Sequence, residues 1–374
     1  MKKVYVLLTV VFLALPAAAH AYIGLCCGKC GGNMPMNIMG GGVPETKEFR
    51  LKISPMFMKM GDLRDGTHSV DEDSLITGMG APYMAVPTEM TMTMTNLAVG
   101  YSFTDDFFVG IMPMWKKNRM RMKVQPMMGA PYKYTMESDG MADTMLMTKY
   151  RLYADDPLIP TNQFSFFFGL SLPTGSIDEE NDEHPDPAKR DALLPYGMQL
   201  GSGTFDPSFG LLYQGSSSPW WWGANLTYTG RWYKNKREYR LGDELKLDLY
   251  GMYQLRYDLV GQLQLNAKSS GKVRGEMDDA RDGLAGRMMN GNYMSPMWDP
   301  DNYGGEKLSA TVGLQWQPFP LHILDVNVGV PIYEDLNGPQ MEEDYRVMLT
   351  WYIEIPTKAS RRYVPKPAKS RLGF

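Results

Sequence analysis

Apolar and polar side chains alternate in segments of about ten residues along most of the chain, from Ile53 to Ile355. Residues two apart share a face of a β-strand, so this alternation predicts strands with one apolar and one polar face. A strand needs only about 9 to 11 residues to cross a bilayer as part of a barrel. We therefore expect an all-β fold, a transmembrane antiparallel up-and-down β-barrel of about 12 strands. The expected strands cover residues 47–59, 89–102, 106–117, 141–153, 161–172, 203–214, 219–231, 244–256, 258–269, 306–317, 321–332 and 344–355.

Two of these segments, 244–256 and 306–317, show the alternation clearly. We expect their apolar faces to meet lipid and their polar faces, with formal charges in the first segment, to meet a wet lumen. The same charges on the lipid face would cost about 2 to 4 kcal/mol each at the bilayer midplane. The expected lipid-facing residues are Leu245, Leu247, Leu249, Gly251, Tyr253, Leu255, Leu308, Ala310, Val312, Leu314 and Trp316.

The connections between these segments alternate in length. Short ones such as 104–106, 216–219 and 318–320 are followed by long ones such as 173–202 and 270–305. Bacterial barrels have short turns on the periplasmic side and long loops outside. We therefore expect both chain ends in the periplasm.

Aromatic side chains gather towards the ends of the expected strands, which is typical of the girdles at the two membrane interfaces. The alternative is a soluble β-protein, whose interior would have to bury most of 8 tryptophans and 22 tyrosines. The expected girdle residues are Trp115, Trp220, Trp221, Trp222, Tyr228, Trp232, Tyr233, Trp316, Trp351 and Tyr352.

The amino-terminal residues predict export. Lys2 and Lys3 precede an apolar run, and Ala19 and Ala21 supply the small residues of a cleavage site. The chain should therefore consist of a signal peptide (1–21), a short Cys/Met-rich periplasmic segment (22–46), an outer-membrane barrel (47–355) and a tail (356–374).

Composition agrees with a barrel. Mean hydropathy is −0.32 although 44% of the residues are hydrophobic, as expected when every strand has a wet face. Without the two signal-peptide lysines, 36 of the 38 basic residues remain against 42 acidic ones, so we expect no nucleic-acid partner.

One motif carries a family resemblance. The run from Leu172 to Gly175 ends one expected strand in L-P-T-G, and the run from Leu200 to Gly210 opens the next as L-G-S-G-T-F-D-P-S-F-G. In this motif the chain resembles the family named for the meta-pathway (MetA-pathway) of phenol degradation. The resemblance implies an outer-membrane β-barrel transporter for small, often hydrophobic compounds. The motif residues are Leu172, Pro173, Thr174, Gly175, Gly201, Gly203, Asp206 and Pro207.

The motif also has a physical interpretation. Pro173 is expected to stop strand pairing at the rim, and Gly175 to permit a turn. Gly201 and Gly203 are expected to let the returning strand twist. No residue of the motif is expected to do covalent chemistry.

Methionine is unusually abundant, with 31 copies that often form M-x-M pairs. We interpret Met56/Met58/Met60, Met112/Met114 and Met145/Met147 first as flexible apolar residues that face lipid. Met90/Met92/Met94 alternate with threonines, so either face of that segment could meet lipid. Thioethers also bind soft ions such as Cu(I), which is the alternative interpretation of these pairs.

The segment before the barrel combines thiols and thioethers. Such ligands predict a possible Cu(I) site, while a disulfide among the cysteines is an equally good interpretation in an oxidising compartment. The candidate metal ligands are Cys26, Cys27, Cys30, Met34, Met36 and Met39.

These observations favour a passive outer-membrane channel for small, hydrophobic or aromatic molecules. Its partners would be membrane lipid and a small solute, with the oligomeric state open. About twelve strands predict a narrow or partly plugged lumen, which residues 22–46 could enter from the periplasmic side. A copper(I)-binding outer-membrane protein and a surface scaffold that presents long loops are the alternatives. We expect no catalysis and no cofactor other than Cu(I), because His68, His184 and His322 fall in separate loops or turns without a nucleophile pattern.

Overall fold

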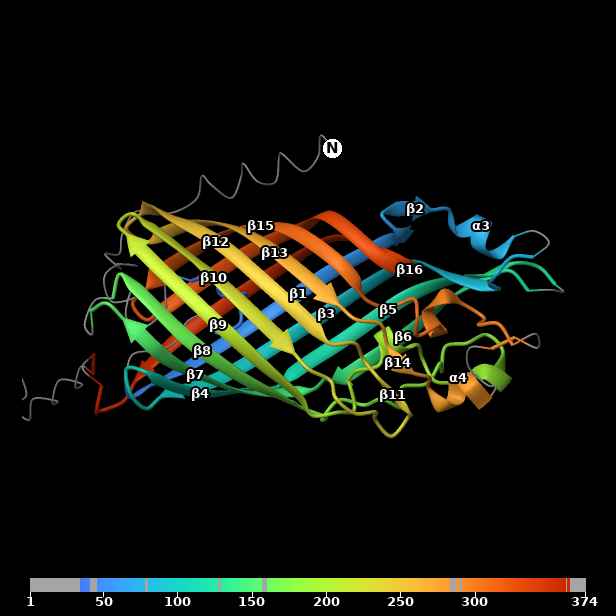
Figure 1. Ribbon diagram of the computed structural model, residues 1–374, viewed down its shortest axis with the longest axis horizontal. Coiled ribbons are helices and arrows are strands. Elements are labelled where there is room, and N and C mark those ends of the chain that lie inside the picture. The colour runs from blue at the N-terminus through green and yellow to red at the C-terminus, as the bar shows by residue number, and fades with distance from the viewer. Residues whose placement is uncertain are drawn as a thin grey trace, which may run out of the picture.

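The computed structural model describes residues 34–40, 46–77, 80–126, 129–156, 160–282, 287–288, 291–360 and 362–363. Antiparallel strands close into an elongated barrel and run at a tilt to its axis (Figure 1). Closure comes from β1, which pairs with β16 on one side and β3 on the other. The barrel is formed by β1 (Glu48–Gly66), β3 (Ala85–Ser102), β4 (Phe107–Met112), β5 (Met114–Val124), β6 (Tyr132–Met141), β7 (Thr144–Ala154), β8 (Asn162–Leu172), β9 (Asp206–Ser217), β10 (Trp220–Thr229), β12 (Glu244–Arg256), β13 (Leu259–Ser270), β15 (Gly305–Phe319) and β16 (His322–Pro356).

β16 is two barrel strands joined by a tight turn. Its first half pairs with β15, from Phe319 with His322 to Gly305 with Leu336. Its second half pairs with β1, ending at Glu48 with Pro356. The two halves lie side by side, as the hydrogen bond from the N–H of Glu354 to the carbonyl oxygen of Leu321 (2.9 Å) shows. Gly338 has a φ of 71°, which suits the turn between them.

The expectation of about twelve strands is confirmed. The sheet of the described residues has 14 strands. One of them, the short β2 (His68–Val70), pairs only with the end of β1. β4 and β5 continue one another across Pro113, and β6 and β7 continue one another across 142–143. Joining these two pairs and leaving β2 aside gives eleven, and the folded-back β16 adds the twelfth.

The outer surface is apolar and the inner surface mainly polar, as the alternation predicts. On β15, Val312 is 56% exposed on the outside, while Ser309, Thr311 and Gln315 are buried inside. On β12, Leu245, Leu247, Leu249, Tyr253 and Leu255 are exposed outside. The expected girdle residues also lie outside, with two corrections. Trp221 and Tyr352 point inward, because each lies between two outward neighbours on its strand.

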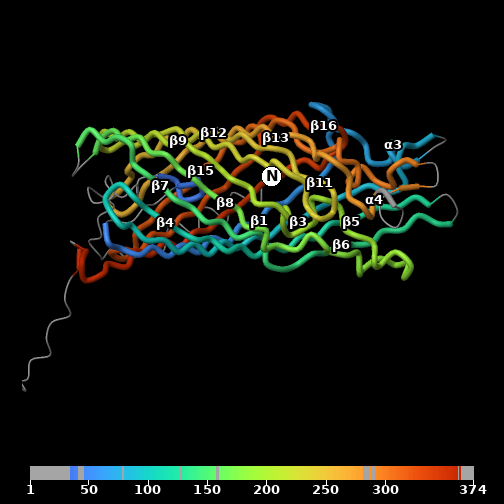
Figure 2. Tube along the Cα trace, turned by 60° about the horizontal axis from the view of Figure 1, so that its bottom comes forward, coloured from blue at the N-terminus to red at the C-terminus, as the bar shows by residue number. Residues whose placement is uncertain are grey.

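The short turns gather at one end of the barrel, which we call the short-turn end (Figure 1). Both ends of the barrel-forming chain lie there, since Glu48 pairs with Pro356. The opposite end, the loop end, carries the long connections with α3 (Glu72–Ile76), α4 (Asp278–Asp282), β11 (Tyr239–Arg240) and β14 (Arg274–Gly275) (Figures 1 and 2). Within the described residues, no helix is both long and apolar enough to cross a membrane.

Strands at the loop end are longer than the pattern predicts. The connection expected between the strands 106–117 and 141–153 is largely strand, since β5 continues to Val124 and β6 begins at Tyr132. Outward side chains in this extension pair across the two strands, with Arg119 on Glu137 (3.0 Å) and Lys117 on Asp139 (3.0 Å). The charged residues of this extension led to the prediction of a loop. On a strand that continues beyond the apolar band, such residues face water.

Replacing Val312 by arginine should test the lipid-facing surface. Val312 is at the middle of β15, so its charge would enter the bilayer centre and cost about 2 to 4 kcal/mol of unfolding free energy. Phe319→Arg, at the short-turn end of the same strand, should cost only about 0 to 1 kcal/mol. Unfolding in urea with lipid vesicles measures both. Equal costs would contradict a membrane band centred on Val312.

Candidate functional site

Methionine side chains line the lumen. Met56, Met58 and Met60 of β1 lie on the inner face with Arg50 and Lys52, while Phe57 is exposed outside. The lipid-facing interpretation of the M-x-M pairs is therefore wrong. The reason is that the residues between the methionines, such as Phe57, already form the lipid-facing side of the strand. The other methionines that line the cavities inside the barrel are Met36, Met39, Met90, Met92, Met94, Met112, Met114, Met145, Met147, Met297, Met341 and Met348.

These methionines stand directly opposite one another across strands. Met348, Met56 and Met94 form one row over β16, β1 and β3. A second row joins Met60, Met90, Met120 and Met136 over β1, β3, β5 and β6. Directly opposite side chains have their Cβ atoms about 4.5 to 5.5 Å apart, so each row is a continuous thioether surface.

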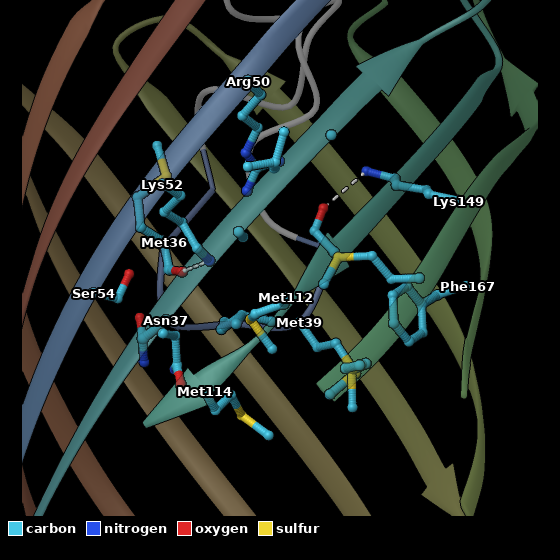
Figure 3. Close-up of a pocket in the computed structure, with 18 of the residues that line it drawn as sticks. Met36, Asn37, Met39, Arg50, Lys52, Ser54, Met112, Met114, Lys149 and Phe167 are labelled. Carbon is cyan, nitrogen blue, oxygen red and sulfur yellow. Dashed lines mark hydrogen bonds between the residues drawn. The ribbon is translucent and has the colours of Figure 1, made fainter. Parts of the chain in front are cut away.

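Two cavities lie inside the barrel. The lower cavity, of about 300 Å³, lies towards the short-turn end and is lined by Arg50, Lys52, Lys149, Phe167 and several methionines (Figure 3). The upper cavity, of about 570 Å³, lies towards the loop end. Both are lined by Asn37, Met39, Lys246 and Met348, so they are neighbouring parts of one passage.

Residues 34–40, which we call the plug segment, narrow the passage at the short-turn end. Met34 is fully buried against Leu212, Trp221 and other inward side chains. Asn37 exchanges two side-chain hydrogen bonds with Gln264 of β13, at 2.8 and 3.0 Å. The expectation that the amino-terminal segment enters the lumen is thus confirmed for the part that the structure describes.

Barrel side chains also hold the backbone of the plug segment. Gln315 donates to the Met34 carbonyl oxygen (2.9 Å) and Lys52 to that of Met36 (3.0 Å). Lys149 donates to the Gly40 carbonyl oxygen at 3.4 Å (Figure 3). Lys52 and Lys149 of the lower cavity thus bind neutral carbonyl groups.

Long connections close the loop end from inside. We call the described residues of 173–205, 230–243 and 271–304 together the loop cap. Their apolar side chains pack on inward methionines of β3, β5 and β6 and form the largest buried cluster. This cluster includes Met90, Met120, Met122, Met136, Leu193, Leu194, Tyr196, Met198, Tyr239, Met277 and Trp298.

His184 belongs to this cap. Its ring lies edge-on against Tyr134 of β6, with 4.7 Å between ring centroids, and Nδ1 accepts from the N–H of Asp186 (3.0 Å). Burial lowers the pKa of the His184 imidazole. The side chain therefore packs as a neutral ring and acts as part of the cap's structure.

The family motif anchors the loop cap to the barrel wall. Asp143, between β6 and β7, accepts hydrogen bonds from the N–H of Gly175 (3.0 Å) and the N–H and Oγ of Ser202 (2.8 and 2.9 Å). A Cβ on Gly201 would lie 2.5 Å from Oδ1 of Asp143 and 2.6 Å from the Gly175 carbonyl oxygen. Both glycines thus permit a close backbone approach, which differs from the turn and twist expected for them. The sequence gives no sign of Asp143.

The remaining motif residues support this anchor. Thr174, which follows the strand end at Leu172 and Pro173, accepts from the N–H of Thr144 (2.9 Å) and donates to the Ala142 carbonyl (3.0 Å). Gly203 has a φ of 72°, the left-handed region that favours glycine. Asp206 pairs with the half-buried Arg231 (3.1 Å), and the Pro207 carbonyl accepts from the N–H of Gly230 (3.0 Å). The motif is a structural clamp.

The structure does not bring the candidate copper ligands together where it describes them. Met34 and Met36 lie in different apolar clusters, and of the two only Met36 joins Met39 in lining the lower cavity. Cys26, Cys27 and Cys30 lie outside the described residues. Among the residues that can be described, no three His, Cys, Asp or Glu side chains group as a metal site. Cu(I) binding therefore stays a prediction.

Comparison with family models confirms the resemblance seen in the motif. The model of the family described as MetA-pathway of phenol degradation matches residues 115–283. The matched region contains the whole clamp, from Asp143 to Arg231. A comparison with curated proteins found no match.

Comparison with solved structures supports the fold. The crystal structure of an outer-membrane channel from Pseudomonas putida F1 is similar with a TM-score of 0.54 and 13% identity, covering 83% of this chain and 96% of that one. Two weaker likenesses are the toluene transporter TodX from Pseudomonas putida (TM-score 0.42, 9% identity, 83% and 90% covered) and the transport unit of the autotransporter AIDA-I from Escherichia coli (0.41, 9%, 88% and 95%). The first shows an outer-membrane barrel fold, and we draw no conclusion from the other two.

Proposed function

We propose that this chain is an outer-membrane channel for passive passage of small hydrophobic or aromatic molecules. The observation that carries the proposal is the passage inside the closed barrel, two neighbouring cavities walled by thioethers. Methionine is flexible and makes favourable contacts between its sulfur and aromatic rings, so a methionine wall suits apolar solutes of varied shape. The matched family's description, a phenol degradation pathway, supports an aromatic solute.

The dimensions of the passage favour small solutes. Volumes of about 300 and 570 Å³ are in the range of pockets for small organic molecules, whereas general porins keep a wide aqueous channel. The plug segment and the loop cap narrow the two ends, so a solute must displace side chains to pass. The proposal includes residence in the outer membrane and removal of residues 1–21. Mass measurement of the protein extracted from outer membranes tests both.

Uptake into proteoliposomes tests the channel. We expect protein-dependent entry of labelled benzyl alcohol into vesicles whose outer leaflet contains lipopolysaccharide, which slows unaided entry. Met145→Trp should strongly reduce this entry, because Met145 lines the lower cavity and a larger ring would fill it. Leu146→Trp is the matched control, because the neighbouring side chain is 39% exposed on the outer face.

The two variants decide the outcome. A loss of entry in Met145→Trp with normal entry in Leu146→Trp supports passage through the lumen. Equal entry in both variants, or none that depends on the wild-type protein, would refute it.

The two alternatives remain predictions. Copper content of the purified protein, measured with and without residues 22–46, tests the copper(I)-binding function. A surface scaffold would show neither solute entry nor conductance. The inward packing of the loop cap leaves less of these connections for an outside partner.

A further inference from the structure

We infer that the lower cavity binds organic monoanions, solutes with an apolar, preferably aromatic, body and one negative charge. This inference rests on the proposed function and names the solute class that the passage would favour. It comes from a combination on one wall: cationic side chains and thioethers face the same enclosed space (Figure 3).

The charged part of the cavity is one-sided. Arg50, Lys52, Lys149 and Lys246 line it, and no aspartate or glutamate is among the described residues of its lining. Taking charged groups out of water costs several kcal/mol per ion unless they are paired. A cavity that keeps such cations without carboxylates in its wall is suited to a negatively charged visitor.

The hydrogen bonds that Lys52 and Lys149 make in this cavity do not neutralise their charge. Lys52 and Lys149 donate to carbonyl oxygens of the plug segment, which carry no formal charge. The Arg50 guanidinium lies over the rings of Phe108 and Tyr352, 5.7 and 5.0 Å from their centroids. Lys246 pairs with the carboxylate of Glu244 at 3.1 Å, and Glu244 lies outside the cavity lining.

Two carboxylates near this end of the lumen interact with the cavity cations, Asp325 with Lys52 and Glu354 with Arg50, and both also have other partners. Asp325 accepts from Gln262 (2.9 Å), and Glu354 accepts from Tyr352 (2.7 Å) and pairs with Arg362 (2.7 Å). They temper the positive field of the cavity, but neither belongs to its lining. A carboxylate of a solute can approach Lys52 and Lys149 from the open space.

The rest of the wall fits the apolar body of such a solute. Met94, Met112, Met114, Met145 and Met147 and the ring of Phe167 line the same cavity. Thioether sulfurs make favourable contacts with the edges of aromatic rings, so several of them can hold a flat ring in different positions. A small inorganic anion would use only the cations, and a neutral ring only the thioethers.

Calorimetry on the full chain in detergent at neutral pH tests the inference with four probes: benzoate, benzyl alcohol, acetate and benzylammonium. We expect benzoate to bind at least about tenfold more tightly than each of the others, since a hydrogen bond to a charged group is worth about 1.5 to 3 kcal/mol. Lys149→Gln should remove most of this advantage. Glutamine can still donate to the Gly40 carbonyl, so the plug segment keeps that contact.

Lys307→Gln is the matched control. Lys307 lines the upper cavity and is paired with Glu334 at 2.7 Å, so benzoate affinity should not change. If Lys149→Gln fails to fold, Lys52→Gln makes the same test from β1. Benzyl alcohol or benzylammonium binding as tightly as benzoate, or an equal loss in Lys307→Gln, would overturn the inference.

The outcome separates this inference from the channel itself. Entry of benzyl alcohol into vesicles without selective benzoate binding would leave the channel standing and remove the anion site. Selective benzoate binding without entry of any probe would keep the site and refute the channel.

Discussion

Removal of residues 22–45 is expected to open the lower cavity to water from the short-turn end. A single cysteine at Ser54, which lines that cavity and is buried, reports the opening. The deletion also removes Cys26, Cys27 and Cys30, so the full-length reference needs these three replaced by serine. We expect labelling by a membrane-impermeant maleimide to accelerate at least about tenfold, because the four hydrogen bonds that Gln264, Gln315 and Lys52 make with the plug segment contribute about 0.5 to 1.5 kcal/mol each.

A cysteine at Thr67 is the control for this measurement. Thr67 is exposed in the turn between β1 and β2, so its labelling rate should be the same with and without the deletion. Gln264→Leu should give an intermediate rate at Ser54→Cys, since of the hydrogen bonds to the plug segment it removes only the exchange with Asn37. Unchanged labelling of Ser54→Cys after the deletion would show that the plug segment does not control access.

Gly201→Ala is expected to loosen the loop cap and destabilise the barrel. The added Cβ would meet Asp143 at 2.5 Å and the Gly175 backbone at 2.6 Å, where backbone cannot give way easily. Overpacking of this kind costs about 1 to 3 kcal/mol, and displacing Asp143 also endangers its hydrogen bonds to Gly175 and Ser202. The temperature at which the folded band disappears on a gel of unboiled samples measures the effect.

Gly251→Ala is the matched substitution. Gly251 is on β12, and a Cβ there would meet nothing within 4 Å. The variant should be as stable as the wild type or slightly more stable, because alanine suits a strand better than glycine. If both variants unfold at the same temperature, the close approach of Gly175 and Gly201 does not stabilise the cap.

Much of the barrel could be predicted from the sequence, because lipid and water on opposite sides impose a period of two on each strand. The same period of two also predicts which face of each strand the methionines occupy. On β1, Met56 is an even number of residues from Arg50 and Lys52, so the three side chains share one face of the strand. Charged side chains of a barrel face the lumen. On β3, Thr91 has the parity of Leu97, which is exposed outside. Following parity along a whole strand, instead of judging each M-x-M pair alone, assigns these methionines to the lumen.

The site itself was less accessible to prediction. The clamp depends on Asp143 meeting Gly175 and Ser202, residues that alternation cannot bring together because they lie in breaks and connections. The burial of Met34 likewise depends on side chains from β9, β10, β12 and β13, which are distant in the chain. Such contacts form only once the barrel is closed, and the local pattern of apolar and polar residues does not show which distant residues then meet.

Closure of the barrel by β1 and β16 has a consequence for how the protein is made. The backbone groups along one edge of β1 have no hydrogen-bond partners until the second half of β16 pairs with them, as Pro356 does with Glu48. An exposed edge cannot persist within hydrocarbon. Assembly must therefore be a late, concerted event that follows export of nearly the whole polypeptide, and pairing partners so remote in sequence make it slow.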